Sequence, residues 1–202
     1  MFLSLRSTLW ALLVGFAATT FTPSVAQARP SARKVKKPIQ VFVNAVRYGK
    51  NAKALEYVDG PAQGEFLLGD AWAKAKPDQQ KKFVSLFHVL FAQLAFPKLK
   101  NNLSKIETIT YGRPELKGEF TEIQSTLVVL HPMKKQEVKV TYRLRKQKKR
   151  YRLVDVTFEG DKSLLTNIRD DQIRPLLSEN GWDGLMGFLE KRAQQIKAKQ
   201  AK

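Results

Sequence analysis

The 202-residue sequence contains no cysteine and only two histidines, His88 and His131. The absence of cysteine excludes disulfide scaffolds, zinc ribbons, iron–sulfur clusters and thiol catalysis. Two histidines leave little room for a histidine-rich metal site, and the sequence has neither a P-loop nor a glycine-rich dinucleotide-binding loop. We therefore expect no metal and no cofactor.

Acidic side chains are also scarce, because 18 Asp and Glu stand against 36 Lys and Arg, which gives a formal net charge of +18. A surplus of this size attracts anions, namely nucleic acids, anionic lipid headgroups or acidic proteins. Apolar residues make up 43% of the chain and charged residues 27%. This composition is typical of a globular protein with a packed core.

The apolar run near the N-terminus, Thr8–Phe21, has 14 residues. At 1.5 Å per residue it is too short to cross a hydrocarbon core of ~30 Å. Arg6 precedes the run and Ala26-Gln27-Ala28 follows it, which is the pattern of a secretory signal. We expect residues 1–28 to be removed after Ala28. Nucleic acids are poor candidate partners outside the cytoplasm, so we do not expect an exported chain to bind them. Membrane surfaces and envelope proteins remain as expected partners.

The rest of the chain divides into three parts. We expect residues 29–38 to form a basic flexible leader, residues 39–196 a single domain, and residues 197–202 a frayed polar tail. Pro38 fits the first turn of a helix. The apolar residues that indicate this helix recur at helical spacing; they are Ile39, Phe42, Val43 and Val46.

The strongest helical pattern covers residues 77–96, where apolar residues form one continuous stripe. The stripe consists of Phe83, Leu86, Phe87, Leu90, Phe91 and Leu94. It suits either a packed core or the wall of an apolar cavity. His88 lies off the stripe, so we do not expect it to be a core ligand. Shorter helical segments are expected at residues 54–58 and 66–72.

From residue 106 the apolar period changes from helical to alternating, which predicts strands at 106–111, 121–131, 136–146 and 150–159. Short separations favour an antiparallel meander. In the third strand, apolar side chains alternate with charged and polar ones, so one face is buried and the other wet. In the fourth strand we expect Val154, Val156 and Phe158 on one side, and Tyr151, Leu153 and Asp155 on the other.

Helical patterns return at the end of the chain. Ser163 is placed to cap a helix that passes Leu165, and Pro175 implies a kink or a restart. A final amphipathic helix follows Gly181. Helices, then an antiparallel sheet, then helices again indicate the α+β class, with about four strands in a curved sheet packed against several helices.

Catalytic constellations are absent from the sequence. A Ser–His–acid triad would need one of the two histidines, and there is no Gly-x-Ser-x-Gly elbow. His131 has the position of a turn residue. Asp170 and Asp171 are adjacent, so on a helix they would point about 100° apart, which does not make a paired acid and base. Asp155 is expected to be a buried structural carboxylate bonded to Arg169 or to the backbone. We expect the protein not to be an enzyme.

Several short motifs resemble one family when they are taken in order. They are Phe66-Leu67-Leu68-Gly69-Asp70-Ala71-Trp72, Pro77-Asp78-Gln79-Gln80-Lys81-Lys82-Phe83, Tyr142-Arg143-Leu144, Tyr151-Arg152-Leu153-Val154-Asp155-Val156, Glu159-Gly160 with Ser163-Leu164, Asn167-Ile168-Arg169 and Gly181-Trp182-Asp183-Gly184-Leu185. Their order and spacing over residues 39–190 are similar to those of the MlaC or toluene-tolerance family. The family usually has Trp where this chain has Tyr151 and an aromatic residue where it has Ile168, which suggests a divergent member.

The resemblance implies a periplasmic phospholipid-binding carrier, the soluble auxiliary component of the Mla ABC transport system that maintains outer-membrane lipid asymmetry. Its partners would be phospholipid as cargo, an inner-membrane ABC transporter complex with its substrate-domain protein, and an outer-membrane lipoprotein complex. The implied fold is cystatin/NTF2-like, with an apolar cavity between sheet and helices. The residues that we expect to contact lipid are Phe83, Phe87, Leu90, Phe91, Leu94, Leu127, Val129, Val138, Val140, Tyr142, Leu144, Tyr151, Leu176, Leu185 and Leu189.

Two alternatives stay open at this stage. The same apolar surface would equally build a filled core, in which case the domain would be a non-enzymatic envelope adaptor for acidic proteins. Residues 134–152 contain ten Lys or Arg and one acid. These charges either form a solvated face or dock an anionic partner, and the residues expected to dock are Lys146, Lys148, Lys149 and Arg150.

Overall fold

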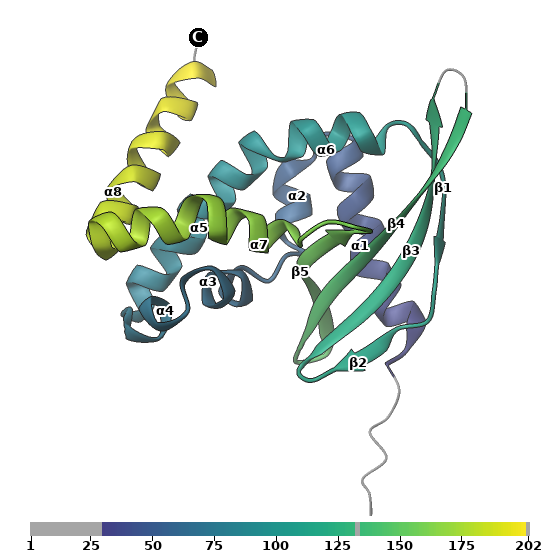
Figure 1. The fold of residues 1–202 in the computed structure, drawn as a ribbon, viewed down its shortest axis with the longest axis horizontal. Coiled ribbons are helices and arrows are strands. Elements are labelled where there is room, and N and C mark those ends of the chain that lie inside the picture. Colours follow the sequence, from purple (N-terminus) through teal and green to yellow (C-terminus); the bar gives the residue numbers. More distant parts are fainter. Residues whose placement is uncertain (1–29, 132–133, 201–202) are drawn as a thin grey trace, which may run out of the picture.

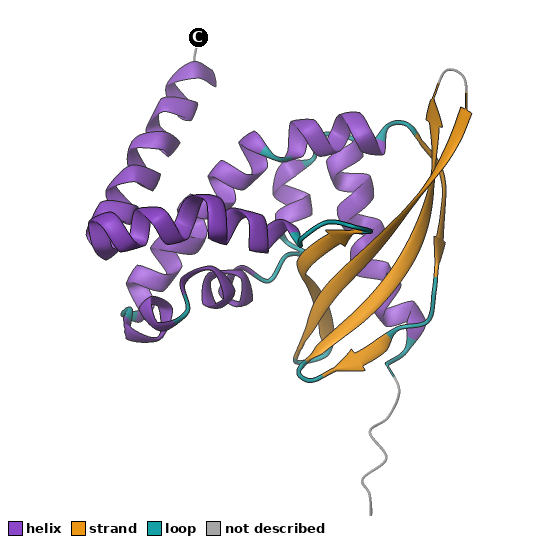
Figure 2. Cartoon of the chain, in the orientation of Figure 1, coloured by secondary structure: helices purple, strands orange, loops and turns teal. Residues whose placement is uncertain are grey.

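The computed structural model describes residues 30–131 and 134–200. Figures 1 and 2 show a curled sheet on one side of the molecule and a group of helices on the other. The strands are β1 (Ile106–Tyr111), β2 (Glu115–Lys117), β3 (Phe120–His131), β4 (Lys134–Gln147) and β5 (Arg150–Phe158). The helices are α1 (Ala32–Arg47), α2 (Asn51–Leu55), α3 (Gly60–Leu68), α4 (Asp70–Lys74), α5 (Pro77–Leu94), α6 (Phe96–Leu103), α7 (Leu164–Ile168) and α8 (Arg174–Gln200).

Every pair of strands in the sheet is antiparallel, in the order β1-β3-β4-β5, with the short β2 pairing beside β3. The long β3–β4 hairpin runs in unbroken register from Phe120 opposite Arg145 to His131 opposite Lys134. Four strands match the predicted ones, β2 is additional, and the α+β expectation is confirmed. None of the helices in the described part of the chain is long and apolar enough to span a membrane.

The alternation expected along β5 is wrong because the strand contains a bulge. Leu144 pairs with Leu153 and Arg143 pairs with Asp155, so Val154 is an extra residue on β5. Leu153, Val154 and Asp155 are consequently all buried. A pattern of period two cannot describe a strand whose ladder shifts by one residue.

The first helix corrects the prediction of a flexible leader. α1 begins at Ala32, inside the segment expected to be irregular, and Val35 is fully buried. Pro38 lies inside this helix rather than in its first turn. The two extra turns are stabilised because Val35 and Ile39 extend the apolar stripe of α1 into the core.

The C-terminal segment changes direction at Gly181. A single π-helical turn, Arg169–Ile173, joins α7 to α8. α8 then kinks at Gly181, where φ is 62° and ψ is −168°. The part after the kink packs against α5, with Leu185 and Leu189 buried and Lys82 of α5 paired with Glu190. Residues 197–200 continue this helix, contrary to the prediction of a frayed tail. The predicted signal, residues 1–28, and residues 201–202 lie outside the described residues.

Candidate functional site: an apolar cavity beneath the sheet

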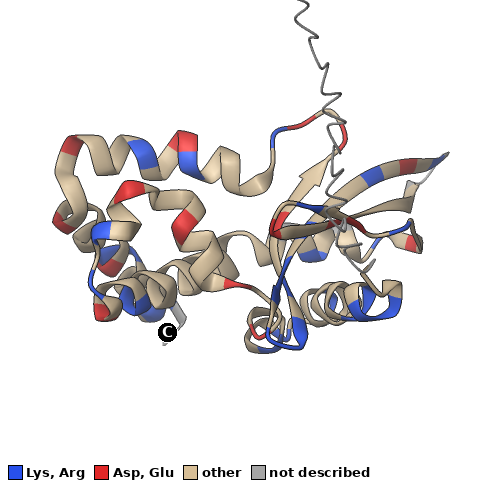
Figure 3. Ribbon diagram, turned by 90° about the horizontal axis from the view of Figure 1, so that it is seen from below, with Lys and Arg blue, Asp and Glu red and all other residues tan. Residues whose placement is uncertain are grey.

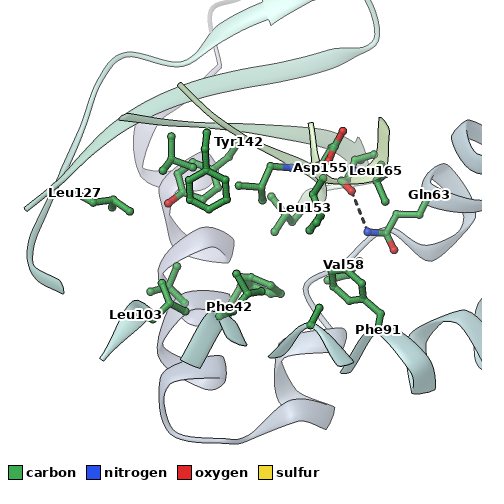
Figure 4. A pocket seen from close by; sticks show the side chains of 18 residues that line it. Phe42, Val58, Gln63, Phe91, Leu103, Leu127, Tyr142, Leu153, Asp155 and Leu165 are labelled. Atoms are coloured by element: carbon green, nitrogen blue, oxygen red, sulfur yellow. Dashed lines mark hydrogen bonds between the residues drawn. The ribbon is translucent and has the colours of Figure 1, made fainter. Parts of the chain in front are cut away.

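A cavity of about 190 Å³ lies between the sheet and the helices (Figure 4). Most of its lining is aliphatic or aromatic, and the polar side chains in the wall are Gln63, Tyr142 and Asp155. The other lining residues are Phe42, Val43, Val58, Phe91, Ala95, Leu99, Leu103, Leu127, Val140, Leu153, Val154, Val156, Phe158, Leu164 and Leu165. The expected cavity between sheet and helices is therefore present.

Two helices that meet at Ala95 build one wall of the cavity. α5 ends at Leu94, and the N–H of Ala95 still donates to the Phe91 carbonyl, so the chain continues almost directly into α6. The Phe96 ring packs edge-on against Phe91, with centroids 5.4 Å apart, and against Phe42 of α1 at 5.8 Å. Such edge-to-face contacts fix the junction of three helices beside the cavity.

The far end of α6 is held by a single guanidinium group. Arg47 of α1 donates to the Leu103 carbonyl from Nε at 3.0 Å and from Nη2 at 2.7 Å, and Nη2 also donates to the Ile106 carbonyl at 2.9 Å. The two bonds to Leu103 satisfy the last carbonyl of α6, which has no partner within the helix. Together the three bonds tie α6 to α1 and to the start of β1.

Asp155 is the one carboxylate in the cavity wall, and its side chain is almost completely buried, with 5% of the residue exposed. Its Oδ1 accepts from the N–H of Val156 at 2.8 Å and of Leu165 at 3.0 Å. The expected backbone bonding is confirmed, whereas Arg169 pairs with Asp170 instead, at 2.9 Å. Among the described residues Oδ2 has no hydrogen-bond partner. Asp155 thus joins β5 to the start of α7.

Gln63 connects three elements at the edge of the cavity. Its amide donates to the Val154 carbonyl of β5 at 3.0 Å (dashed in Figure 4), and its Oε1 lies 3.1 Å from Nε2 of His88 on α5. His88 therefore contacts α3 instead of facing solvent, and burial lowers its pKa to about 4. The imidazole is neutral near pH 7, and Nε2 donates to the Gln63 oxygen.

An ion pair between Asp59 and Arg145 connects the start of α3 to strand β4. Asp59 is fully buried, and its Oδ1 accepts from the N–H of Ala62, which caps α3. Arg145 of β4 donates to both oxygens of Asp59, from Nε at 2.9 Å and from Nη2 at 3.2 Å, and to Glu65 at 3.1 Å. Arg145 belongs to the face expected to be wet, but its partner comes from a distant loop.

A family model described as MlaC protein matches residues 35–191, which is most of the chain. The chain belongs to the MlaC family. No match was found among the curated proteins.

Solved structures place this MlaC chain in a known fold. The phospholipid-binding protein from Ralstonia solanacearum, solved in complex with a phospholipid, is 20% identical with a TM-score of 0.64. The match covers 82% of this chain and 97% of that chain. At this identity the likeness shows a shared fold. A second structure, with NTF2 in its name, is 13% identical over 61% of this chain and 94% of that chain, with a TM-score of 0.38.

The sequence-based set of lipid contacts in this MlaC chain coincides only in part with the cavity wall. Of the fifteen expected residues, the four that line the cavity are Phe91, Leu127, Val140 and Tyr142. Phe83 and Phe87 lie on the same helical stripe as Phe91, yet they stack on each other and Phe83 packs against Trp72 and Trp182. The remaining expected residues lie elsewhere, and they are Leu90, Leu94, Val129, Val138, Leu144, Tyr151, Leu176, Leu185 and Leu189.

The four expected docking residues lie at the β4–β5 turn and are exposed. Lys149 and Arg150 line a second, basic hollow of about 560 Å³, whereas Lys146 and Lys148 do not. The described residues contain no group of three or more His, Cys, Asp or Glu that could hold a metal ion.

Proposed function

We propose that this MlaC-family chain is a phospholipid carrier that holds acyl chains in the cavity beneath the sheet. The observation that carries the proposal is the cavity itself, because an almost wholly apolar void is what a filled core lacks. The phospholipid bound to the structural neighbour from Ralstonia solanacearum supports the same ligand class.

The volume of the cavity limits which ligands can enter it without movement of its walls. A void of about 150 Å³ is enough for benzene, and pockets for drug-sized ligands span roughly 300–1,000 Å³. At about 190 Å³ the cavity of this chain lies near the lower figure. An acyl chain therefore enters only if the walls move apart. α6 is one of the short wall elements, and the Arg47 guanidinium fixes its far end.

The energetics explain why a carrier is needed. Transfer of each CH₂ out of water contributes about 0.8 kcal/mol, so a 16-carbon chain represents roughly 13 kcal/mol. A lipid does not leave a bilayer for water at a useful rate against that difference. A protein that buries the chain and closes when empty offsets the cost without exposing an apolar surface.

The cellular setting is part of the same proposal. We propose that the mature chain acts in the periplasm, between an outer-membrane lipoprotein complex and an inner-membrane ABC transporter with its substrate-domain protein, and helps to maintain outer-membrane lipid asymmetry. The N-terminal signal pattern and the MlaC family support this setting. The chain would carry lipid rather than transform it.

The test is transfer of a fluorescent phospholipid from donor to acceptor vesicles by the mature chain and two tryptophan variants. Val140 lies in the cavity wall, so in Val140→Trp the indole occupies the void and excludes lipid. Thr141, the next residue of β4, points to the other face of the sheet, so Thr141→Trp is the matched control. We expect lipid uptake to fall at least about tenfold in Val140→Trp and to stay unchanged in Thr141→Trp.

Thermal unfolding of both variants accompanies the transfer measurement, because small-to-large changes in a tight core cost about 1–3 kcal/mol. A melting temperature of Val140→Trp close to that of the parent would confirm that the void accepts the ring. Equal transfer by both variants, or none by the parent chain, would contradict the proposal and favour the envelope-adaptor alternative.

A further inference from the structure

The second hollow of the molecule is strongly cationic. Six of its ten lining residues are Lys or Arg and one is acidic. The cations come from three elements that are distant in sequence, and they are Lys34, Lys37, Lys53, Lys149, Arg150 and Arg152. We name this hollow, with Glu56, Tyr57, Tyr151 and Pro38 completing its wall, the basic cleft. Lys34 and Lys37 are three residues apart on α1 and therefore share one helix face.

Much of this charge is not neutralised within the chain. Lys53 pairs with Glu56 at 2.6 Å, and Arg152 donates to the Glu56 carbonyl at 2.8 Å. Among the described residues, Lys34, Lys149 and Arg150 form no ion pair. Like charges that converge without partners repel one another and destabilise the free protein, so an anion that enters the cleft is bound favourably.

The charge excess of the whole chain does not account for this gathering. Figure 3 shows basic and acidic residues spread over both the helical half and the sheet half of the molecule. Elsewhere on the sheet, cations lie beside acids, as in the pairs Lys135–Glu107, Lys139–Glu159 and Arg143–Glu122. The cleft is thus a local departure from a surface where the two signs are interspersed.

We propose that the basic cleft binds an acidic segment of a partner protein. The hollow is concave, whereas a bilayer surface is flat on this scale and would reach only its rim. The five cations other than Lys53, which pairs with Glu56, also exceed what one phosphate headgroup needs, but they match several carboxylates of one extended segment. Tyr57 and Tyr151 add aromatic surfaces of the kind enriched in protein interfaces.

The cleft borders the cavity along three segments of the chain, namely α1, β5 and the connection between α2 and α3. On α1, Pro38 lines the cleft and Phe42, one turn later, lines the cavity; on β5 the corresponding residues are Tyr151 and Leu153. Tyr57 of the cleft is followed directly by Val58 of the cavity. A partner segment in the cleft therefore contacts residues adjacent to the cavity wall. This docking role extends the proposed function but does not depend on lipid being bound.

The test uses the mature chain and a fluorescein-labelled octaglutamate peptide, with binding followed by fluorescence anisotropy at about 50 mM and about 150 mM salt. The cleft variant is Lys34→Glu/Lys149→Glu/Arg150→Glu. The matched control, Lys74→Glu/Lys105→Glu/Lys191→Glu, changes the net charge equally at exposed positions outside the cleft. We expect the cleft variant to bind at least about tenfold more weakly and the control to change by less than about threefold.

A charge-neutralising variant can be tested in the same way if charge reversal prevents folding. Lys34→Gln/Lys149→Gln/Arg150→Gln removes the three charges without adding any, and it should weaken binding in the same direction. Amide spectra should place the peptide-induced shifts at the start of α1 and the β4–β5 turn. Equal weakening in the cleft and control variants would overturn the proposal, because net charge alone would then explain binding.

Vesicles of phosphatidylcholine with about one fifth phosphatidylglycerol distinguish the two anionic partners. Vesicle binding that needs the cleft residues while octaglutamate binding does not would overturn the proposal in favour of lipid headgroups. Native mass spectrometry of the same variants separates this proposal from the proposed function. Normal lipid loading with lost peptide binding supports the cleft, whereas absent lipid in every variant contradicts only the carrier.

Discussion

At the scale of single residues, the buried pair Asp59–Arg145 holds α3 against the sheet. Removal of one partner from a buried pair is costly because the other charge stays buried, typically by about 3–5 kcal/mol. The Arg145 side chain is 21% exposed while Asp59 is fully buried, so we expect a value near the lower end. Arg145→Met should lower the free energy of unfolding by about 3 kcal/mol in urea denaturation.

The control lies two residues away on the same strand. Arg143 pairs with Glu122 at 3.1 Å, but its side chain is 39% exposed. Exposed pairs contribute about 0–1 kcal/mol, so Arg143→Met should change stability little. Similar losses in both variants would contradict a special role for the Asp59 pair.

His88 makes stability depend on pH. Burial holds its pKa at about 4 in the folded chain, below the ordinary 6.5 of the unfolded chain. Well above pH 6.5 the imidazole is neutral in both states. As the pH falls through 6.5 towards 4, the unfolded state takes up the proton first and the folded state loses stability. Between pH 7 and pH 5 the loss from His88 is up to about 2 kcal/mol.

Urea denaturation at these two pH values checks the effect. In His88→Gln the side chain does not titrate, so the difference in unfolding free energy between pH 7 and pH 5 should be smaller than in the parent. An unchanged difference would contradict the burial of the imidazole against Gln63.

At the scale of elements, the kink in α8 depends on a backbone conformation that only glycine adopts easily. Gly181 has φ 62° and ψ −168°, in a region that costs other residues about 1–3 kcal/mol. Gly187 lies in the same helix, its φ is not in the positive range, and a Cβ added there would meet no atom within 4 Å. We expect Gly181→Ala to lower the melting temperature. Gly187→Ala should raise it, because Ala in a helix interior is more stable than Gly by about 0.5–1 kcal/mol. Equal effects of the two substitutions would contradict the kink.

α6 is the element that we expect to move during lipid exchange. In Arg47→Gln the C-terminal Leu103 carbonyl of α6 loses both of its guanidinium donors. Hydrogen exchange of α6 amides should become faster while α5 amides stay protected, and vesicle-to-vesicle lipid transfer should accelerate. Unchanged exchange in α6 would show that Arg47 does not hold this wall.

Local sequence patterns predicted the elements better than the site. Alternation placed four strands within two residues of their observed ends, and one stripe placed α5, because each pattern reflects burial against a neighbouring layer. β2 has only three residues, too few for an alternating pattern, and α6 has eight, although its Phe96, Leu99 and Leu103 recur at helical spacing. The bulge at Val154 depends on pairing with β4, which no local pattern records.

The site was predicted less well for a physical reason. A stripe indicates which face of a helix is buried but not whether its neighbours fill the space. Phe83, Phe87 and Phe91 lie on one stripe, yet only Phe91 lines the cavity. Val58, Leu99 and Phe158 meet in its wall from distant parts of the chain. The Asp59–Arg145 pair joins residues 86 apart and left no sequence signal of its own.

At the scale of the whole molecule, one hydrophobic core extends from the aromatic cluster of the helical group to the void beneath the curled sheet. Ring contacts connect Phe83 and Phe87 through Phe91 to Phe96 beside the cavity. The central claim is that the void is a lipid site rather than a packing defect.

Native mass spectrometry of the mature chain purified without detergent, followed by solvent extraction, tests that claim most directly. We predict a stoichiometric mass excess over the bare chain that extracts as phospholipid. A bare mass that remains unchanged after incubation with phospholipid vesicles would contradict the carrier.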